Sequence, residues 1–386
     1  MYERSISRIL AKSRKSILLL GPRQVGKSTL LKSLSPGLSL NFAEPRTFRD
    51  YVSRPEKLGE ELDAADESVK TILLDEVQRV PAILDVIQIA SDDRPGRFRF
   101  LLSGSSARKL KLGQANLLPG RIQVHHLHPL LASELGADFD LKRVLAHGTL
   151  PGIYAETDPG ERARDLSAYA DIYLREEIQA EALVRDVGAY GRLLELVAAS
   201  SGRILNVNSL CREAGIRYET ARRYLDVLLD TLVAFNVPAW SGSDRSGLVT
   251  HPKIFLFDLG VRNALLRRPL DASLEDEKGL LFEHLVAYEL HRRTGSLWPE
   301  AKLSYFRNRH GSEVDFVVEA GKEVWGIEVK SGRDSQSVRL SGLDALAERV
   351  PRLKRKIVVF LGNRKQSRDG VEFIPFDDLQ RELPSP

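Results

Sequence analysis

The sequence predicts an α/β protein in three parts, with β-strands in the first and last parts and a mainly helical middle part. Three observations lead to this prediction. "SILLLGPRQVGKSTLL" puts a glycine-containing loop between an apolar strand and a helix, and "SLCREAGIRYETARRYLDVLLD" has two helical patterns around a short turn. "SEVDFVVEAGKEVWGIEVKSG" alternates apolar and polar residues on both sides of a Gly–Lys turn. We expect the three parts to span residues 1–135, 136–270 and 271–386.

Composition narrows the class of protein without naming a function. The chain has 386 residues, 42% hydrophobic and 28% charged, which is typical of a globular protein with several domains. The formal net charge of +4 permits a polyanionic partner but does not require one. A single cysteine, Cys211, excludes a disulfide within the chain and favours a reducing, cytoplasmic location. We recognise no signal peptide and no membrane span, and expect no membrane partner.

The loop of the first part fits the phosphate-binding pattern G-x-x-x-x-G-K-[ST]. Its backbone N–H groups and the N-terminus of the following helix can surround phosphate oxygens. Lys27 is expected to reach the β- and γ-phosphates of ATP, and the Ser28 hydroxyl is expected to bind Mg²⁺. The predicted nucleotide-binding residues of this loop are Gly21, Arg23, Gly26, Lys27, Ser28 and Thr29.

Two further strands of the first part end in polar residues. "TILLDEVQRV" ends in Asp75 and Glu76, where open α/β sheets bind their ligands. We expect Asp75 to join the Mg²⁺ shell and Glu76 to polarise the attacking water. "RFRFLLSGSS" ends in Ser103 and Ser105, of which one is expected to contact nucleotide or water; we select Ser103, and a plain Ser/Gly turn is the alternative. The nearby histidines of "VHHLH" lack the ligand spacing of a zinc site.

The sequence of the middle part predicts a helix-turn-helix followed by two strands that form a wing. Ser209 suits the N-cap of the first helix, and Gly215 suits the turn between the helices. Arginines on the second helix and the wing are candidates for DNA phosphate contacts: Arg217, Arg222, Arg223 and Arg245. The alternative is a protein–protein module. Arg175, on the long helical stretch before this motif, is a candidate nucleotide contact, although a solvated charge is the simpler interpretation.

The hairpin of the last part suggests a divalent-metal site. If Gly321 and Lys322 form a two-residue type II′ turn, Ala320 faces Glu323 and Asp315 faces Glu328. Two opposed carboxylates are destabilising unless a cation lies between them, and oxygen ligands suit Mg²⁺ or Mn²⁺. The same register places Glu313 opposite Lys330. One face of the hairpin is expected to be buried: Val314, Phe316, Val318, Trp325, Ile327 and Val329.

These motifs also carry a resemblance to known families. "GPRQVGKSTLL", "ILLDEVQRVP", "FLLSGSSARKL" and "LPGRIQVHHLHPL" resemble the P-loop, Walker B, sensor-1 and Gly-Arg segments of a prokaryotic AAA-type ATPase family. In such ATPases an arginine often completes a neighbouring subunit's site, and Arg121 is the candidate for this role; a surface arginine is the alternative. The resemblance also implies assembly into a ring or another homo-oligomer.

The last part resembles the PD-(D/E)xK, restriction-endonuclease-like nuclease core. Glu283, Asp315, Glu328 and Lys330 match its acidic residues and lysine by type and order. The whole layout resembles bacterial and archaeal AAA-type ATPases whose C-terminal domain was long of unknown function. It implies an ATP-hydrolysing protein that processes duplex or branched DNA, with or without metal-dependent nuclease activity. The alternative is a regulatory or defence ATPase switch whose last domain only binds DNA or a protein.

Overall fold

The first part of the chain folds into a parallel sheet flanked by helices. The computed structural model describes residues 2–105, 120–173, 186–241, 248–268, 275–298, 300–334 and 340–383. The sheet order is β2-β3-β4-β1-β5, and all neighbouring strands are parallel. Its strands are β1 (Ser16–Leu20), β2 (Leu38–Asn41), β3 (Thr71–Asp75), β4 (Arg99–Gly104) and β5 (Ile122–His126). Its helices are α1 (Ser7–Lys12), α2 (Lys27–Lys32), α3 (Pro45–Ser53), α4 (Lys57–Asp63), η1 (Val77–Arg79) and α5 (Ile83–Asp93).

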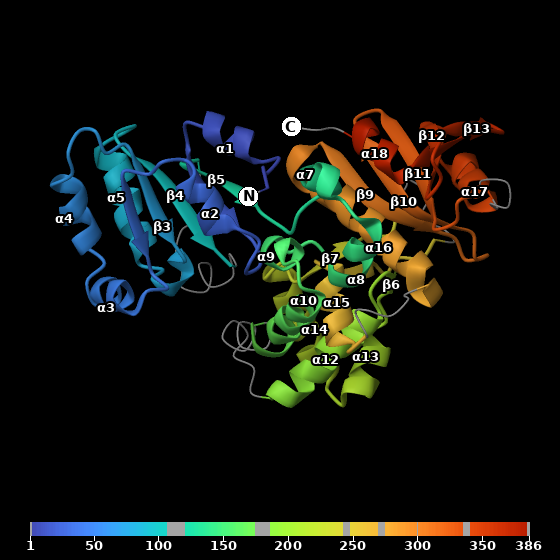
Figure 1. The fold of residues 1–386 in the computed structure, drawn as a ribbon, viewed down its shortest axis with the longest axis horizontal. Coiled ribbons are helices and arrows are strands. Elements are labelled where there is room, and N and C mark those ends of the chain that lie inside the picture. The colour runs from blue at the N-terminus through green and yellow to red at the C-terminus, as the bar shows by residue number, and fades with distance from the viewer. Residues whose placement is uncertain are drawn as a thin grey trace.

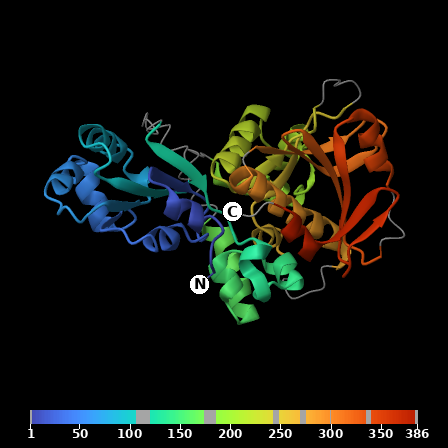
Figure 2. The same cartoon turned by 90° about the horizontal axis from the view of Figure 1, so that it is seen from above.

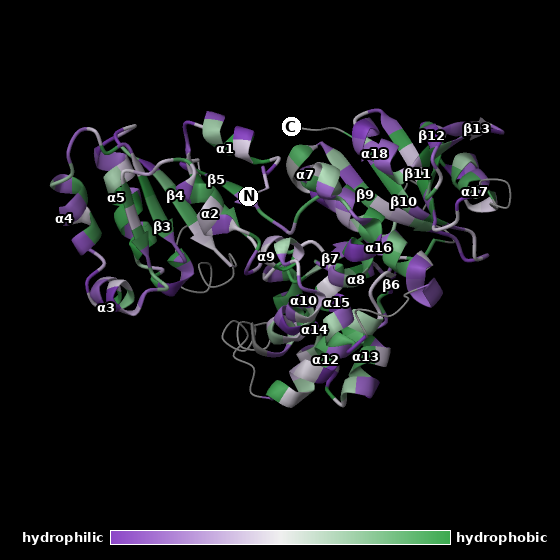
Figure 3. Ribbon diagram, viewed as in Figure 1, coloured by the Kyte–Doolittle hydropathy of each residue, from purple (hydrophilic) through white to green (hydrophobic). Residues whose placement is uncertain are grey.

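The three central strands of this sheet, β1, β3 and β4, are mostly apolar and buried because helices cover both faces of the sheet (Figure 3). One face packs with α4 and α5 around Phe100 and Leu102. The other face packs with α1, α2 and residues of the middle part around Leu19 and Leu101. The carboxyl ends of β1 and β3 meet at the same edge, which is where the phosphate-binding loop and Asp75 lie.

The middle part consists mainly of short helices and lies between the other two parts (Figure 1). Its helices are α7 (Ala132–Leu135), η2 (Gly136–Asp138), α8 (Leu141–His147), α9 (Pro151–Ala155), α10 (Pro159–Ala168), η3 (Tyr169–Tyr173), α12 (Val187–Ala199), α13 (Val207–Ala214), α14 (Tyr218–Asp230) and α15 (Leu259–Leu265). A small antiparallel sheet, ordered β6-β8-β7, accompanies them: β6 (Arg203–Ile204), β7 (Ala234–Val237) and β8 (Lys253–Leu256).

The predicted helix-turn-helix is present as α13 and α14. Gly215 ends α13 in a left-handed conformation at φ 69°, as the predicted turn requires. The predicted apolar stripe of α14 is buried, including Ala221 and Tyr224. The predicted N-cap is wrong, because Asn206 occupies that position and its side chain accepts the Ser209 N–H at 3.0 Å. Arg175 and Arg245 lie outside the described residues.

The last part is built on a mixed sheet, ordered β13-β14-β12-β11-β10-β9. Its strands are β9 (Ala301–Arg307), β10 (Glu313–Ala320), β11 (Glu323–Lys330), β12 (Leu353–Phe360), β13 (Gln366–Arg368) and β14 (Val371–Pro375). Its helices are η4 (Glu275–Glu277), α16 (Lys278–Arg292), η5 (Arg293–Leu297), α17 (Ser341–Arg349) and α18 (Phe376–Glu382). Helices α16 and α18 pack on one face of the sheet and α17 packs on the other.

The hairpin has the predicted register, but both of its faces are buried. Ala320 pairs with Glu323, and Gly321 takes a positive φ of 59° at the turn. Five of the six predicted apolar residues share the core that contains α16. Val314 instead joins the core under α17, because a bulge in the β9 pairing between Val314 and Val317 reverses the alternation. Val317 and Val324 are also buried on that second face.

Continuous apolar clusters join the three parts. Leu19 of β1 and Leu193 of α12 belong to one cluster. Phe255 of β8 and Phe316 of β10 belong to another. Viewed from above, the first part lies on one side, and α7 to α10 form the connection to the rest (Figure 2). No helix among the described residues has the length and apolar character needed to cross a bilayer.

Because several histidines are buried and neutral in the folded protein, we expect the protein to lose stability in acid. His284, fully buried on α16, contacts Ser201 Oγ at 3.3 Å and the Leu256 carbonyl at 2.7 Å. Burial is the main cause that lowers its pKa to about 4, and burial also lowers the pKa of His147 and of His291 to about 4. The unfolded chain therefore binds more protons than the folded one between pH 6.5 and 4, so stability falls as pH decreases through this window.

We expect His284 alone to contribute on the order of 3 kcal/mol to this loss at pH 4. Urea unfolding between pH 7 and pH 5 measures the slope of the free energy of unfolding against pH. In His284→Gln the amide can still donate to the Leu256 carbonyl without titrating, so the slope should be shallower than in the wild type. If the free energy of unfolding changed equally with pH in the two proteins, His284 would not be a source of the stability loss.

Candidate functional site

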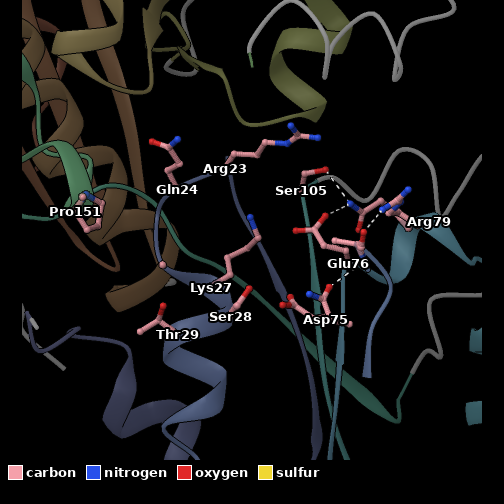
Figure 4. Close-up of a pocket in the computed structure, with 15 residues that line it drawn as sticks. Arg23, Gln24, Lys27, Ser28, Thr29, Asp75, Glu76, Arg79, Ser105 and Pro151 are labelled. Carbon is pink, nitrogen blue, oxygen red and sulfur yellow. Dashed lines mark hydrogen bonds between the residues drawn. The ribbon is translucent and has the colours of Figure 1, made fainter. Parts of the chain in front are cut away.

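The P-loop forms one wall of a cavity of about 820 Å³ at the carboxyl edge of the first sheet (Figure 4). The chain leaves β1 at Leu20 and enters α2 at Lys27, with Gly26 at φ 93° as the N-cap residue. That left-handed conformation favours glycine. Gly21 does not line the cavity. A Cβ there would lie 2.0 Å from the Leu127 carbonyl oxygen, so this glycine permits close backbone approach to the segment after β5.

Lys27 is positioned to meet an anion. Its side chain is buried, and its ammonium donates to the carbonyl oxygens of Gly21 at 2.7 Å and Pro22 at 2.9 Å. Both acceptors belong to the loop itself. A phosphate oxygen would be a stronger acceptor for this ammonium than either carbonyl oxygen, because the acceptor would then carry a negative charge as well. The predicted loop residues Arg23, Ser28 and Thr29 also line the cavity, together with Gln24.

Asp75 and Glu76 face Lys27 across the cavity (Figure 4). Asp75 ends β3, and its carboxylate accepts a hydrogen bond from the Ser103 hydroxyl on neighbouring β4. The same hydroxyl accepts the Glu76 N–H at 3.1 Å. Ser103 is fully buried and does not line the cavity, so the prediction that it contacts nucleotide is wrong. Ser103 orients Asp75 and the backbone of Glu76. Ser105 lines the cavity instead.

Gln78 positions Glu76 and was not predicted. Glu76 has a left-handed backbone at φ 61°, which starts the η1 turn and places Gln78 beside it. The Gln78 amide nitrogen contacts Glu76 Oε2 at 2.5 Å and Ser105 Oγ at 3.2 Å. The spacing "DEVQ" is the signal that the sequence offered, because a side chain two residues beyond Glu76 returns to it only in a tight turn. Gln78 therefore holds the Glu76 carboxylate at the cavity wall.

The middle part contributes to the cavity as well. Pro151 and Gly152 at the start of α9 line it, and sequence reasoning did not identify them. They also border an adjoining cavity of about 670 Å³, which is lined by apolar groups such as Leu30 and Leu130. The second cavity is also lined by charged groups such as Arg4 and Asp138, so it offers both apolar and polar contacts beside the charged one.

Arg121 lies away from the cavity of its own chain. Ile122 pairs with Ser16 at the beginning of β1, whereas the P-loop follows the end of that strand, about 13 Å further along. The Arg121 guanidinium is exposed and forms an ion pair with Asp92 at 2.7 Å. It can therefore meet a nucleotide only in a neighbouring subunit, and that role stays a proposal.

The structure brings the four predicted nuclease-like residues into one cluster on α16, β10 and β11. The strand pairing runs from Ala320–Glu323 to Phe316–Ile327, and Asp315 and Glu328 are the next residues on the two strands. Glu283 of α16 and Asp315 of β10 both approach the Lys253 ammonium, at 2.9 Å and 3.9 Å. Lys330 donates to Glu328 Oε1 at 2.6 Å, and Asp315 accepts the Val329 N–H at 2.8 Å.

Lys253 of β8 completes this cluster and was not predicted. Its ammonium lies 2.9 Å from Glu283 Oε1, 2.8 Å from Glu313 Oε1 and 3.9 Å from Asp315 Oδ1. Glu313 forms ion pairs with Lys253 at 2.8 Å and with Arg307 at 3.2 Å. The only sequence signal was a lysine that begins the apolar run "KIFLFD".

Burial and mutual repulsion raise the pKa values of two carboxyl groups in the cluster. Burial first, and then the charge of Asp315, raises the pKa of Glu283 and of Glu328 to about 7 each. Glu283 also contacts the Lys253 ammonium, whose own pKa is raised by the surrounding carboxylates. The pKa of Glu283 is raised despite this contact because Lys253 is shared by Glu283, Glu313 and Asp315. The cluster therefore has more acidic groups than cations to balance them and can retain a proton near neutral pH.

A divalent-metal site at Asp315 and Glu328 was expected, and the structure differs from that expectation. Among the described residues, no group of three or more His, Cys, Asp or Glu side chains is arranged to hold a metal ion. Ammonium groups meet these carboxylates instead: Lys253 lies 3.9 Å from Asp315, and Lys330 lies 2.6 Å from Glu328. The rings of His126 and His128 lie 6.2 Å apart between centroids, and burial lowers the pKa of each.

The candidate DNA-contacting arginines on α14 are accessible. Arg217, Arg222 and Arg223 are exposed. The strands predicted for the wing, β7 and β8, pair with each other but pack against the last part of the chain. The segment after β7 also pairs with β9, where the Trp240 N–H donates to the Tyr305 carbonyl at 2.6 Å. The described part of the wing is therefore docked within the protein.

Three family models match successive parts of the chain. An AAA domain matches residues 13–136, a domain of unknown function (DUF8612) matches residues 138–272, and a second domain of unknown function (DUF4143) matches residues 278–379. Two curated proteins are similar along most of their length: the uncharacterized proteins Mb2031c of Mycobacterium bovis and Rv2008c of Mycobacterium tuberculosis. Each is 26% identical over 369 residues, which covers 94% of this chain and 80% of the relative.

Comparison with solved structures gives only distant likeness. A replication initiator DnaA, bound to AMPPCP and single-stranded DNA, covers 58% of this chain and 85% of its own at 12% identity and a TM-score of 0.28. PCH-2 of C. elegans covers 59% and 66%, at 15% identity and a TM-score of 0.27. The AAA family match and the P-loop geometry agree, and residues 13–136 therefore resemble an AAA-type P-loop domain.

Proposed function

We propose that this protein hydrolyses ATP and uses the resulting conformational change to process DNA. The observation that carries the proposal is one cavity that contains Lys27 and Ser28 on one side and Asp75 and Glu76 on the other. Separate strands and a loop bring these groups together at the edge where α/β sheets bind ligands. This arrangement supplies the parts of a phosphoryl-transfer site.

Each residue has a distinct role in the proposed reaction. Lys27 stabilises negative charge on the β- and γ-phosphates, and the N-terminus of α2 adds its positive dipole. Ser28 and Asp75 are the oxygen donors that would hold Mg²⁺, which supplies charge neutralisation when it is bound. Glu76 orients and polarises the attacking water, and Gln78 keeps its carboxylate in place. We also propose that Arg121 acts in the site of a neighbouring subunit, which implies a ring or another homo-oligomer.

DNA is the proposed partner because of two features outside the ATP site. Exposed Arg217, Arg222 and Arg223 can contact phosphates, although Glu219 and Asp226 on the same helix reduce the local positive charge. The last part runs helix–strand–strand–strand–helix–strand from α16 to β12, which supports a restriction-endonuclease-like fold. Such a domain can bind DNA whether or not it cuts.

The decisive experiment measures phosphate release with single-stranded, duplex and branched DNA and without DNA. We expect DNA to stimulate hydrolysis, with the preferred structure giving the largest effect. Arg222→Ala and Arg223→Ala together should weaken DNA binding and reduce stimulation, while DNA-free hydrolysis should stay unchanged. ATP turnover without any DNA binding or stimulation would instead favour a regulatory switch. No ATP turnover under any condition would contradict the proposed enzyme activity itself.

A further inference from the structure

Lys253 is a buried cation that crosses from the middle part of the chain into the last part. It begins β8, and its side chain is 4% exposed. Its ammonium contacts Glu283 on α16 and Glu313 on β10, and it lies 3.9 Å from Asp315. A buried lysine is unfavourable unless it is paired, and here the carboxylates of another structural unit provide the pairing.

The position of this ammonium conflicts with a divalent metal bound by the same carboxylates. Metal–oxygen distances are about 2.0–2.6 Å, so a metal bound by Glu283 and Asp315 would lie in the region that Lys253 already occupies. The ammonium would also repel a dication in a buried setting where screening is weak. Glu328 does not add a free negative charge that could attract the metal, because it is paired with Lys330 at 2.6 Å.

Lys253 cannot leave easily, because its strand is held on several sides. β8 is the central strand of its sheet, between β6 and β7. The next residues, Ile254 and Phe255, are completely buried in the two large clusters that join the parts of the chain. Backbone bonds between Tyr305 and the segment after β7 fasten the same region to β9: Tyr305 N–H donates to the Pro238 carbonyl at 2.9 Å.

We infer that Lys253 is the permanent cation of this carboxylate cluster and takes the place of a divalent metal. The cluster then joins the last part of the chain to the middle part and does not cleave DNA. The acidic residues and the lysine of the nuclease-like pattern serve as an ion-pair network at the domain boundary. This inference does not depend on ATP hydrolysis or on DNA binding. The inference can therefore be wrong while the proposed function is right, and the reverse is equally possible.

The first test measures Mn²⁺ binding to the nucleotide-free full-length protein by electron paramagnetic resonance. Wild type and Asp315→Asn should give the same titration, because this cluster binds no metal in either protein. Stoichiometric Mn²⁺ binding that disappears in Asp315→Asn would overturn the inference. The wild-type measurement does not depend on whether a Lys253 variant folds.

The second test removes the internal cation. In Lys253→Met the carboxylates lose their counter-charge, and we expect the melting temperature to fall on the order of 5–10 °C. Glu283→Gln added to this variant should recover part of the loss, because it removes one uncompensated charge. Lys356→Met is the matched control at a more exposed ion pair, with Asp344 at 2.8 Å, and should shift the melting temperature far less. Equal melting temperatures for wild type and Lys253→Met would contradict the inference.

Discussion

Replacing Lys27 with alanine is expected to abolish ATP turnover. The ammonium is the buried positive side chain aimed into the cavity, and its present acceptors are carbonyl oxygens of the loop. Without it, charge that develops on the transferred phosphoryl group loses its nearest cation. Removing one preorganised electrostatic donor of this kind costs roughly a hundredfold to a thousandfold in rate. Phosphate release at saturating Mg²⁺ and ATP measures the effect.

Lys32→Ala is the matched control for this experiment. Lys32 is at the end of the same helix, α2, and is exposed. Its replacement removes the same charge and the same side-chain length without changing the cavity, so turnover should stay close to that of the wild type. Turnover of Lys27→Ala within twofold of Lys32→Ala would show that the assigned loop is not the catalytic phosphate site.

Glu76→Gln is expected to lower the rate of hydrolysis by roughly a hundredfold to a thousandfold while ATP still binds. The amide keeps the size of the side chain but cannot accept a proton from water. Binding of a fluorescent nucleotide analogue and steady-state phosphate release separate the two steps. Equal losses in affinity and in turnover would mean that Glu76 acts in binding rather than in catalysis.

Gln78→Ala tests how Glu76 is held. Gln78 contacts Glu76 and Ser105, so its removal frees the carboxylate without removing it. We expect kcat to fall by about tenfold with KM little changed, because an interaction specific to the transition state is weakened. In the Glu76→Gln background the same change should have almost no further effect. Additive losses in the double variant would contradict a role through Glu76.

Local sequence patterns predicted the features whose parts are adjacent in the chain. The P-loop lies within eight consecutive residues, from Gly21 to Ser28, and its glycine, lysine and hydroxyl positions follow from phosphate chemistry. The hairpin register follows from one two-residue turn, because the turn geometry determines every pair beyond it. Helix-turn-helix periodicity is local in the same way, and α13 and α14 lie where the pattern placed them.

Features that depend on packing between distant segments were not predicted. Ser103 looked like a ligand contact because it ends a strand, but its neighbour on the sheet, Asp75, takes its hydroxyl. Val314 followed the alternation, but a bulge against β9 moved it to the opposite core. No periodicity reveals either result, because each depends on which strand lies beside which.

The sequence alone predicted a phosphate-binding loop in the first part and a hairpin register that sets Asp315 opposite Glu328. Only the tertiary structure decided that Asp315 meets the Lys253 ammonium. Lys253 and Asp315 are more than sixty positions apart in the chain. The apolar surfaces of β8, α16 and β10 bring them together because burying those surfaces stabilises the fold. Local chemistry predicted a site with an excess of negative charge, and long-range packing supplied a lysine to balance it.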